Sequence, residues 1–458
     1  MDPRFVLAKL SASLFKYVLR LSGSGGTAAP GLLASYIDSN SLKKLNSYVS
    51  DVILVTGTNG KTTTSRIIGS ALENFGLKYI HNREGSNLMR GVVGSLISKT
   101  PIFPSNEKPL ALLEIDEATL PLVISQTSPK IIVINNLFRD QLDRYGEVDS
   151  IRKMWHETLK NLDDSTTLIL NSDDPSVAHL AKGSRAKVIF FGLEDNKYTL
   201  AKLPHASDFT SCIVCGSELN YDTVYMSHLG KFKCPSCGEK RPKPDVYAED
   251  ITLEDESGFK AKIVTPEGNF NINTRLPGLY NVYNCLSAIS VSLALNIPLQ
   301  KIIKSLRSFE AVFGRTEILE VGKKRLYITL VKNPTGFNEI IRTMFNKNKK
   351  RYTFIAINDL IADGRDVSWL WDVDFELMQG KVAKAYISGI RAADMGLRFK
   401  YAGLKTNSLD SNIEKALESA YADVPENETL FIFPTYTAML EINKFLSKKG
   451  YAERFWEN

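Results

Sequence analysis

The chain has little cysteine, no long apolar run, and no internal repeat or low-complexity tract. Only five of its 458 residues are cysteine, and four of these stand in two close pairs. An odd count clustered in this way argues against a disulfide framework and favours a metal site in a reducing compartment. No apolar run approaches the roughly 18 residues that a membrane-spanning helix needs, so the sequence predicts no transmembrane segment.

Neither charge nor length points to an unusual class of protein. The 57 lysines and arginines exceed the 51 aspartates and glutamates by little, which gives a net charge of +6. This balance suits acidic substrates such as nucleotides but does not require nucleic acid. The length exceeds what one simple core accommodates, so we expect two or three domains.

The N-terminal segment resembles a signal peptide only superficially, because Lys9, Lys16 and Arg20 interrupt every apolar window. Its apolar residues recur at helical spacing with basic residues between them: Phe5, Leu10, Leu14, Phe15, Val18 and Leu19. We favour a helix that packs on its own domain. The alternative is a helix that rests on an anionic membrane surface.

From Asp51 onward, short apolar runs such as VILVTG, LALLEID, KIIVINN and TTLILN alternate with helical or polar sequence. This alternation predicts an α/β fold with parallel strands and crossover helices. Paired cysteines break the rhythm near residues 200–245, and RLYITLV, RYTFIAIN, VAKAYISG and ETLFIFP predict the strands of a second α/β domain. We therefore expect a helical segment (1–48), a central domain (49–310) with an insertion at about 205–245, and a C-terminal domain (311–458).

A glycine-rich turn follows the strand VILVTG and opens a helix. Glycines let the backbone approach an anion, and the amides at a helix N-terminus point toward it. A lysine then reaches the terminal phosphates, and a hydroxyl completes the shell of a magnesium ion. The alternative is a chance glycine turn. The residues expected to bind ATP are Gly57, Thr58, Asn59, Gly60, Lys61, Thr62 and Thr63.

The segment TGTNGKTTT resembles the nucleotide loop of the Mur ligases and folylpolyglutamate synthetases. Enzymes of that family use ATP to convert a carboxylate to an acyl phosphate, which an amine attacks. Further matches follow in the family's order: Glu114 at a strand end, Asn135–Gly146, Asn171–Pro175, Asn281 in YNVYNCLSA, Arg315 in FGRTE, and Lys332–Gly336. Together they imply a Mur ligase-type ATPase domain with a zinc-ribbon insertion and a C-terminal α/β domain.

The resemblance also implies roles for single residues. Thr62 and Glu114 would bind Mg²⁺, Lys61 and Glu114 would act in catalysis, Asn281 would read adenine, and Arg315 would contact phosphate. Taken singly, Glu114 could be an ordinary strand-end carboxylate, Asn281 a helix cap and Arg315 a surface ion-pair residue.

The sequence departs from the family at several positions. Gln141 stands where the family has a histidine ligand for magnesium, and Thr329 and Lys332 replace an aspartate and a histidine of the last domain. A carbamylated lysine has no clear counterpart, although Lys153 is nearby. Only about fifty residues precede the loop, so we expect the UDP-binding domain of most Mur ligases to be missing and the substrate to be held differently.

The insertion carries two C-x-x-C-G knuckles, eighteen residues apart, formed by Cys212, Cys215, Cys234 and Cys237. Four thiolates at this spacing predict a structural, tetrahedral zinc site. The alternative is a redox dithiol pair or free thiols. Cys285 is expected to be a small buried apolar residue.

A zinc ribbon can also bind nucleic acid. The insertion carries five basic residues: Lys231, Lys233, Lys240, Arg241 and Lys243. Such a run is usually a solvated face, and Tyr221, Tyr225 and Phe232 are too few aromatics for stacking on bases. We therefore expect no nucleic-acid partner.

The last domain contains an unusual acidic loop, NDLIADGRDVSWLWDVDFE (Asn358–Glu376), after a predicted strand. Asp363-Gly364 suits a turn and Asp366 a helix cap, but exposed loops at strand ends also carry chemistry. This loop, the ATPase centre and the four-cysteine insertion together resemble the MurT family, the synthetase subunits of bacterial lipid II isoglutaminyl synthases.

That resemblance implies a glutaminase partner of the GatD type, which releases ammonia from glutamine. The synthetase would use ATP to amidate the α-carboxylate of D-glutamate in the lipid II stem peptide, giving D-isoglutamine. Asp366 would complete the partner's Cys–His pair by orienting the histidine. The chain has no credible Cys–His pair of its own, because Cys285 is its only cysteine outside the zinc set.

Two other classes of function remain open at this point. One is a folylpolyglutamate synthetase-like enzyme or another Mur-type amino-acid ligase, which has no reason to carry four cysteines. The other is a nucleotide-switched, zinc-ribbon protein that binds nucleic acid. We expect a cytoplasmic protein, with peripheral attachment to the inner face of the cell membrane as an alternative.

Overall fold

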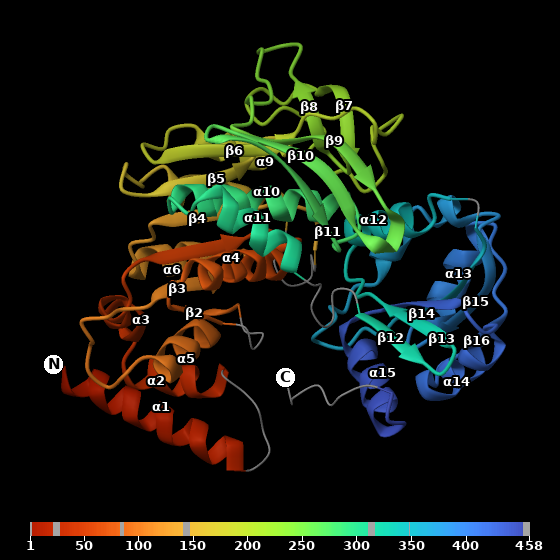
Figure 1. Cartoon of the computed structure of the whole chain (residues 1–458), viewed down its shortest axis with the longest axis horizontal. Helices are drawn as coiled ribbons and strands as arrows, with labels where there is room; N and C mark the ends of the chain where they lie inside the picture. The colour runs from red at the N-terminus through yellow and green to blue at the C-terminus, as the bar shows by residue number, and fades with distance from the viewer. Residues whose placement is uncertain are drawn as a thin grey trace.

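A computed structural model describes residues 2–21, 28–82, 87–140, 147–309, 317–347 and 349–451. It contains two bodies, each built around its own β-sheet (Figure 1). The larger sheet belongs to the red-to-green part of the chain, and the smaller sheet to the cyan-to-blue part. The N-terminal helices lie below the larger sheet in that view.

Within the described residues, nine strands form the larger sheet in the order β11-β10-β9-β6-β5-β4-β1-β3-β2. The strands from β2 to β9 are parallel along this order, and β10 and β11 extend the sheet in antiparallel fashion. Their bounds are β1 Val52–Thr56, β2 Tyr79–His81, β3 Leu110–Glu114, β4 Ile131–Ile134, β5 Thr167–Asn171, β6 Lys187–Leu193, β9 Val246–Leu253, β10 Phe259–Thr265 and β11 Gly268–Thr274.

Helices cover both faces of this sheet, because its strands bury side chains on both sides. In β1, Ile53 and Val55 point into one core and Val52 and Leu54 into the other. The first core is covered by α4 (Lys61–Phe75), α10 (Leu279–Ala294) and α11 (Leu299–Ser308). The second is covered by α1 (Pro3–Leu21), α2 (Ala28–Ile37), α3 (Ser41–Leu45), α5 (Met89–Lys99), α6 (Leu120–Gln126) and α8 (Val148–Leu159).

An insertion between β6 and β9 carries the hairpin β7 (Asn220–Met226) and β8 (Leu229–Lys233), at the top of Figure 1. Short helices fill the remaining connections: α9 Pro175–Ala178, η1 Asn46–Tyr48, η2 His179–Ala181 and η3 Asp255–Ser257. The hairpin packs beside β5 and β6, because Tyr225 and Leu229 belong to the same core as the sheet residues Phe191 and Leu193.

Six described strands form the smaller sheet in the order β12-β13-β17-β14-β15-β16, parallel except for the hairpin β12–β13. The strands are β12 Glu317–Val321, β13 Lys324–Ile328, β14 Arg351–Ala356, β15 Val382–Ser388, β16 Ser408–Asp410 and β17 Thr429–Pro434. The helices are α12 Pro334–Met344, η4 Ser368–Asp372, η5 Phe375–Met378, α13 Ala392–Tyr401, α14 Ile413–Asp423 and α15 Tyr436–Lys448.

The α/β fold with a parallel sheet agrees with the sequence prediction, and each quoted apolar run is a strand. The antiparallel extension β9–β10–β11 was not predicted, because its strands alternate polar and apolar residues and bury mainly one face. The expected boundary at residues 310 and 311 lies outside the described residues. The division into three segments stays a prediction.

Candidate active site

The glycine-rich turn expected to bind ATP, Gly57–Thr63, is called the phosphate loop. It joins β1 to α4 at the point where the strand order reverses, with β3 on one side of β1 and β4 on the other. Ligands of open α/β sheets bind outside the strand ends at such a point. Gly60 adopts a φ of +85°, and a Cβ added there would lie 2.1 Å from the Asn284 side-chain oxygen. Gly57 has a φ of +126°. Both positions of the loop therefore require glycine.

Lys61 lies at the first position of α4, and its ammonium group is buried. It donates to the carbonyl of Gly57 over 2.5 Å and forms an ion pair with Glu117, with 2.9 Å between Nζ and Oε2. Burial by itself lowers the pKa of Lys61, but Glu117, with Glu114 and Asp116 behind it, raises that pKa above its ordinary value. The lysine is therefore a fixed cation.

Thr62 and Glu114, the two residues expected to bind magnesium, lie together. The Thr62 hydroxyl donates to Glu114 Oε1 over 3.0 Å. Glu114 ends β3, and its backbone exchanges two hydrogen bonds with the side chain of Asn82. A hydroxyl and a carboxylate on neighbouring elements present the hard oxygen ligands that Mg²⁺ prefers.

The rest of the loop is held by the segment that follows β4. The amide of Asn59 donates to the side chain of Asn136 over 2.8 Å. The Thr58 hydroxyl accepts from the amide of Phe138 and donates to its carbonyl, at 2.9 and 3.1 Å. These contacts fix Thr58 and Asn59 as part of the turn and leave Thr62 and Thr63 lining a cavity.

This cavity lies between the larger and the smaller body. Asn281, near the start of α10, lines it and is held by two hydrogen bonds, one to the Pro277 carbonyl and one from Asn284. Apolar groups line the same space, together with the buried carboxyl of Glu339 on α12. Burial raises the pKa of Glu339, and the nearby Arg342 opposes that rise. The residues expected to bind phosphate thus border a partly apolar space of the kind that can hold a nucleoside.

The two bodies meet at the phosphate loop itself. Lys332 donates to the Thr58 carbonyl over 3.1 Å and pairs with Asp140 at 2.5 Å. Asn333 caps α12 and also donates to the Asn59 side chain over 3.0 Å. The segment that departs from the family pattern at Lys332 therefore clamps the loop from the second domain.

The four cysteines of the insertion converge, with their sulfur atoms all within 4.8 Å of one another. Cys212 and Cys237 are 3.5 Å apart, as are Cys215 and Cys234. Each knuckle turns through a left-handed glycine, Gly216 or Gly238, whose amide donates back to the first cysteine's carbonyl. A tetrahedral zinc with bonds of about 2.3 Å needs sulfurs at nearly these separations, so the four residues suit that ion.

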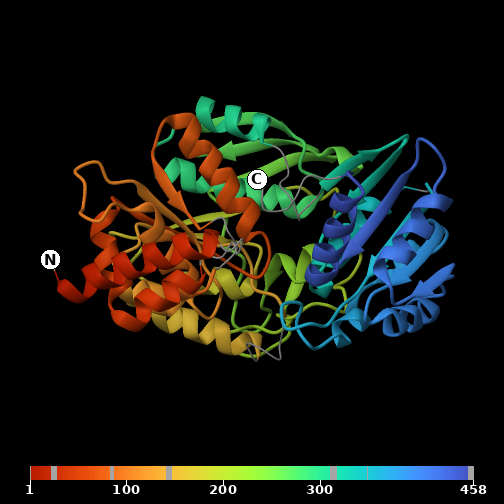
Figure 2. The ribbon, with the colours of Figure 1, turned by 90° about the horizontal axis from the view of Figure 1, so that it is seen from below.

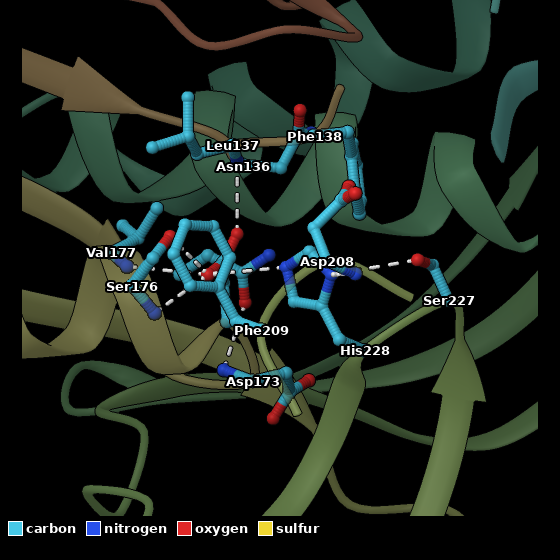
Figure 3. Close-up of polar contacts among 12 residues, drawn as sticks. Asn136, Leu137, Phe138, Asp173, Ser176, Val177, Asp208, Phe209, Ser227 and His228 are labelled. Carbon is cyan, nitrogen blue, oxygen red and sulfur yellow. Dashed lines mark hydrogen bonds and ion pairs between the residues drawn. The ribbon is translucent and has the colours of Figure 1, made fainter. Parts of the chain in front are cut away.

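A buried polar network ties the insertion to the segment behind the phosphate loop (Figure 3). Asp174 and His228 are fully buried, with 3.5 Å between Oδ1 and Nε2. Asp174 also accepts from the amides of Leu137 and Ser176. Burial alone raises the pKa of Asp174, but His228, the Ser176 hydroxyl and the Leu137 amide together lower it below its ordinary value. The ring of His228 packs on Phe138, next to Thr58.

The basic residues of the insertion are partly neutralised within the domain. Arg241 pairs with the buried Asp173 and with Glu194, and Lys231 also pairs with Glu194. Burial raises the pKa of Asp173, and the charge on Arg241 acts in the opposite direction. Both basic side chains are therefore engaged within the domain, and the absence of a nucleic-acid partner stays a prediction.

The acidic loop of the last domain has one buried and one exposed aspartate at its centre. Asp363 accepts hydrogen bonds from Leu360 and from the amide and hydroxyl of Thr437, so it anchors the loop to the start of α15. Asp366 is exposed, and among the residues that the structure describes its side chain accepts one hydrogen bond, from the Ser368 amide over 2.8 Å. Asp366 is therefore held in place and open to a partner.

Two family models match the chain: the Mur ligase middle domain at residues 55–235 and the MurT ligase C-terminal region at residues 330–439. A Staphylococcus aureus (strain COL) protein named lipid II isoglutaminyl synthase (glutamine-hydrolyzing) subunit MurT is 30% identical over 439 residues, covering 95% of this chain and 96% of that protein. The chain belongs to the MurT family. The Streptococcus pneumoniae protein of the same name is 30% identical over 453 residues, covering 98% of each.

A solved structure supports the fold of this MurT-family chain. The pseudomurein peptide ligase type C from Methanothermus fervidus superposes with a TM-score of 0.71 and 22% identity, covering 90% of this chain and 81% of that one. The predicted family and fold are confirmed, and the chain is a subunit of an ATP-dependent ligase. ATP and Mg²⁺ are the cofactors that this fold implies, and the cysteine cluster is compatible with zinc.

Two expected residues fall outside the described part of the chain: Arg315, expected to contact phosphate, and Gln141, which replaces a family histidine.

The contact between Lys61 and Glu117 was not predicted from the sequence. Glu117 lies three residues beyond Glu114, and sequence alone did not single it out as the partner of Lys61. The run of acids in LLEIDE was its only signal. Lys153, the nearby lysine, is exposed and paired with Asp149.

Proposed function

We propose that this chain is the synthetase subunit of a lipid II isoglutaminyl synthase. It would convert the α-carboxylate of D-glutamate in the lipid II stem peptide to the amide of D-isoglutamine. Two nearly full-length relatives carry that name. The observation that carries the proposal is the cluster of Lys61, Thr62 and Glu114 beside a cavity that the second domain closes. Such a site suits activation of an acid by ATP away from water.

In this proposal the triphosphate of ATP lies along the loop from Gly57 to Thr63, whose amides face it. Lys61 leaves Glu117 and neutralises the terminal phosphate. Asn281 reads the adenine from the cavity wall, and Arg315 contacts phosphate from the connection between the domains. Thr62 and Glu114 hold Mg²⁺, which would supply charge neutralisation at the phosphates.

The reaction then proceeds in two steps within the closed cavity. An oxygen of the substrate carboxylate attacks the γ-phosphorus, and the bond from that phosphorus to the ADP oxygen breaks. Ammonia attacks the carbon of the resulting acyl phosphate, loses a proton, and expels inorganic phosphate. Lys61 offsets the charge that builds on the transferring group. Lys332 and Asn333 keep water away by holding the domains together at the loop.

The ammonia would come from a glutaminase subunit of the GatD type. Asp366 would reach across the interface and orient the catalytic histidine of that subunit. Exposed apolar side chains surround the acidic loop, with Ile361 at 79%, Ile390 at 55% and Trp371 at 50% exposure. Large exposed apolar residues around a held carboxylate are typical of a protein interface.

The zinc would have a structural role, with Cys212, Cys215, Cys234 and Cys237 as its ligands and none left open for chemistry. Through His228 and Asp174 the insertion supports the segment that holds Thr58. We place the reaction on the cytoplasmic side of the membrane. Among the described residues, no helix is both long and apolar enough to cross a membrane.

A reconstitution tests the function directly. The chain is purified with and without a co-expressed GatD-type glutaminase and given ATP, Mg²⁺, lipid II and either glutamine or ammonium. We expect mass spectrometry to detect replacement of one hydroxyl by an amino group, from ammonium with either preparation and from glutamine only with the partner. Full activity of a Lys61→Ala variant would contradict the proposed ATP site. Glutamylation of folate in a parallel assay would instead favour the folylpolyglutamate synthetase-like alternative.

A further inference from the structure

The first helix, α1, has two apolar faces. Its inner face is formed by Phe5, Ala8 and Ala12, which are 3%, 0% and 0% exposed and belong to the core beneath the larger sheet. Its outer face carries five large side chains that this packing leaves in solvent. They are Leu7, Leu10, Leu14, Tyr17 and Val18, with exposures of 57%, 47%, 66%, 61% and 51%.

The five residues form one continuous stripe, because intervals of three and four residues return to the same side of a helix. The favoured prediction of a helix that packs on its own domain is confirmed, since Phe5, Ala8 and Ala12 join the core. The apolar residues Leu10, Leu14 and Val18 do not face that core, contrary to what their spacing suggested. Small alanines take the inner positions, so α1 lies close to α2 and α5 while its larger residues point away. Soluble domains rarely expose such a stripe without using it.

The charged residues of α1 are all basic. The helix from Pro3 to Leu21 contains no acidic residue. Arg4, three residues before Leu7, is exposed beside the stripe, and Lys16 is partly exposed one turn after Ala12. The nearby acids, Asp2 and Asp38, share one partner, Lys44, so these three groups together carry a charge of −1. Arg4 and Lys16 exceed that charge, and an apolar stripe on a basic helix complements a surface that is apolar below and anionic above.

The position of α1 leaves the stripe accessible. Figure 1 places α1 at the lower outer edge of the molecule, with α2 and α5 between it and the sheet, and in Figure 2, seen from below, the N-terminal helices face the viewer. On α2, Leu32 and Tyr36 are also exposed, at 57% and 90%. The first body therefore has an apolar, basic outer edge remote from the acidic loop of the second body.

We infer that α1 docks flat on an anionic phospholipid surface, with Leu7, Leu10, Leu14, Tyr17 and Val18 in the boundary between headgroups and acyl chains. The inference rests on the proposed function, since a lipid-linked substrate is presented at such a surface. A helix in this position binds through apolar burial and attraction to anionic lipid together. Docking would bring the ATPase body to the membrane and leave the acidic loop free for the glutaminase.

Flotation of the full-length chain with lipid vesicles tests this inference. Vesicles of phosphatidylcholine alone are compared with vesicles containing phosphatidylglycerol, at low and high salt. We expect binding to the anionic vesicles, weaker binding at high salt, and a loss of at least about tenfold in the Leu10→Glu/Leu14→Glu variant. Leu122→Glu on α6 is the matched control, because Leu122 is 48% exposed and Leu10 is 47% exposed.

Equal vesicle binding by the wild type and the Leu10→Glu/Leu14→Glu variant would overturn the inference, as would a wild type that ignores anionic vesicles. If light scattering instead shows that the wild type self-associates and this variant does not, the stripe covers a second copy and the inference is wrong. Nucleotide binding is measured on the Leu10→Glu/Leu14→Glu variant as well. Unchanged nucleotide binding shows that the variant has lost the stripe and not the ATP site of the proposed function. If the wild type binds anionic vesicles but does not amidate lipid II, the proposed function is wrong and the inferred docking surface still stands.

Discussion

Lys61 and Glu117 form a buried ion pair, with 2.9 Å between the ammonium nitrogen and a carboxylate oxygen. Lys61 opens the helix after the phosphate loop, and Glu117 follows β3. The lysine that would meet the terminal phosphate of ATP therefore has a carboxylate partner within the protein itself. Binding of ATP exchanges one anion for another around a cation whose burial would otherwise be costly.

Replacing Glu117 by Gln should destabilise the free protein more than the nucleotide-bound protein. Removing one partner from a buried pair leaves an uncompensated charge, at a cost of about 3 kcal/mol. ATP with Mg²⁺ should restore much of this loss, because its phosphates supply the missing negative charge. Thermal unfolding with and without nucleotide measures both effects.

The matched control for Glu117 is the exposed pair Lys78–Glu107, whose side chains are 79% and 81% exposed. Glu107→Gln should leave unfolding unchanged, since exposed pairs contribute little. If Glu117→Gln lowers the melting temperature equally with and without ATP, the lysine does not exchange its carboxylate for phosphate.

Thr62→Val should raise the Mg²⁺ concentration needed for half-maximal amidation by about tenfold or more, because the variant loses a hard oxygen ligand next to Glu114. The assay is a magnesium titration of the reconstituted reaction at saturating ATP. Thr64→Val is the control, because the Thr64 hydroxyl bonds to side-chain amides: it donates to Asn284 over 3.3 Å and accepts from Asn135 over 3.0 Å. An unchanged magnesium requirement in Thr62→Val would remove this residue from the metal site.

The glycine turn between β1 and α4 was predictable because its signal is contained in consecutive residues, from Gly57 to Thr63, whereas binding of ATP by these residues stays a prediction. The four cysteines were predictable for a similar reason, since a short spacing within each knuckle fixes the geometry of two ligands. Glu117 was not, because its contact with Lys61 joins segments 56 residues apart. Only the pairing of β1 with β3 brings the two together.

The first helix shows a different limit of sequence analysis. A periodic pattern tells which residues share a face, but it does not tell which face turns inward. In α1 the small residues Ala8 and Ala12 allow close packing and take the core side. The larger Leu10 and Leu14 remain outside, although their hydrophobicity suggested the opposite.

Cys215→Ser should release the zinc and destabilise the insertion. A structural zinc contributes its binding free energy to folding, and three remaining thiolates hold it less well. We expect less than one zinc per chain by mass spectrometry and an earlier unfolding transition. Cys285→Ala is the control, because Cys285 is buried in α10, away from the other four cysteines. Full zinc content in Cys215→Ser would contradict the four-thiolate site.

Asp174→Asn should remove part of the acid sensitivity of the fold. The pKa of Asp174 in the folded protein lies below its ordinary value of 3.8. The charged carboxylate therefore stabilises the fold above that value, and this stabilisation is lost as the pH falls through the folded-state pKa. Urea unfolding should give the variant a lower free energy of unfolding than the wild type at pH 7. This difference in free energy should shrink below about pH 4. A difference independent of pH would show that the charge of Asp174 contributes nothing.

Asp366→Asn should separate the two sources of ammonia. If Asp366 orients a histidine in the partner, the variant complex should lose most of its glutamine-dependent amidation, because a neutral amide does not stabilise the histidine cation. Its rate with ammonium should match the wild type, since Asp366 is exposed and its hydrogen bond within the described part of the chain comes from the Ser368 amide of the same loop.

Both initial rates are measured on the same purified complex. Because unfolding would lower both rates, a selective loss of the glutamine-dependent rate is not a loss of folding. Asp363→Asn is the informative companion, because Asp363 anchors the loop through Thr437 and Leu360. That change should disorder the loop and weaken binding of the glutaminase itself, as seen by gel filtration. Asp366→Asn should leave the complex intact. Equal loss of both rates in Asp366→Asn would place this residue outside the glutaminase reaction.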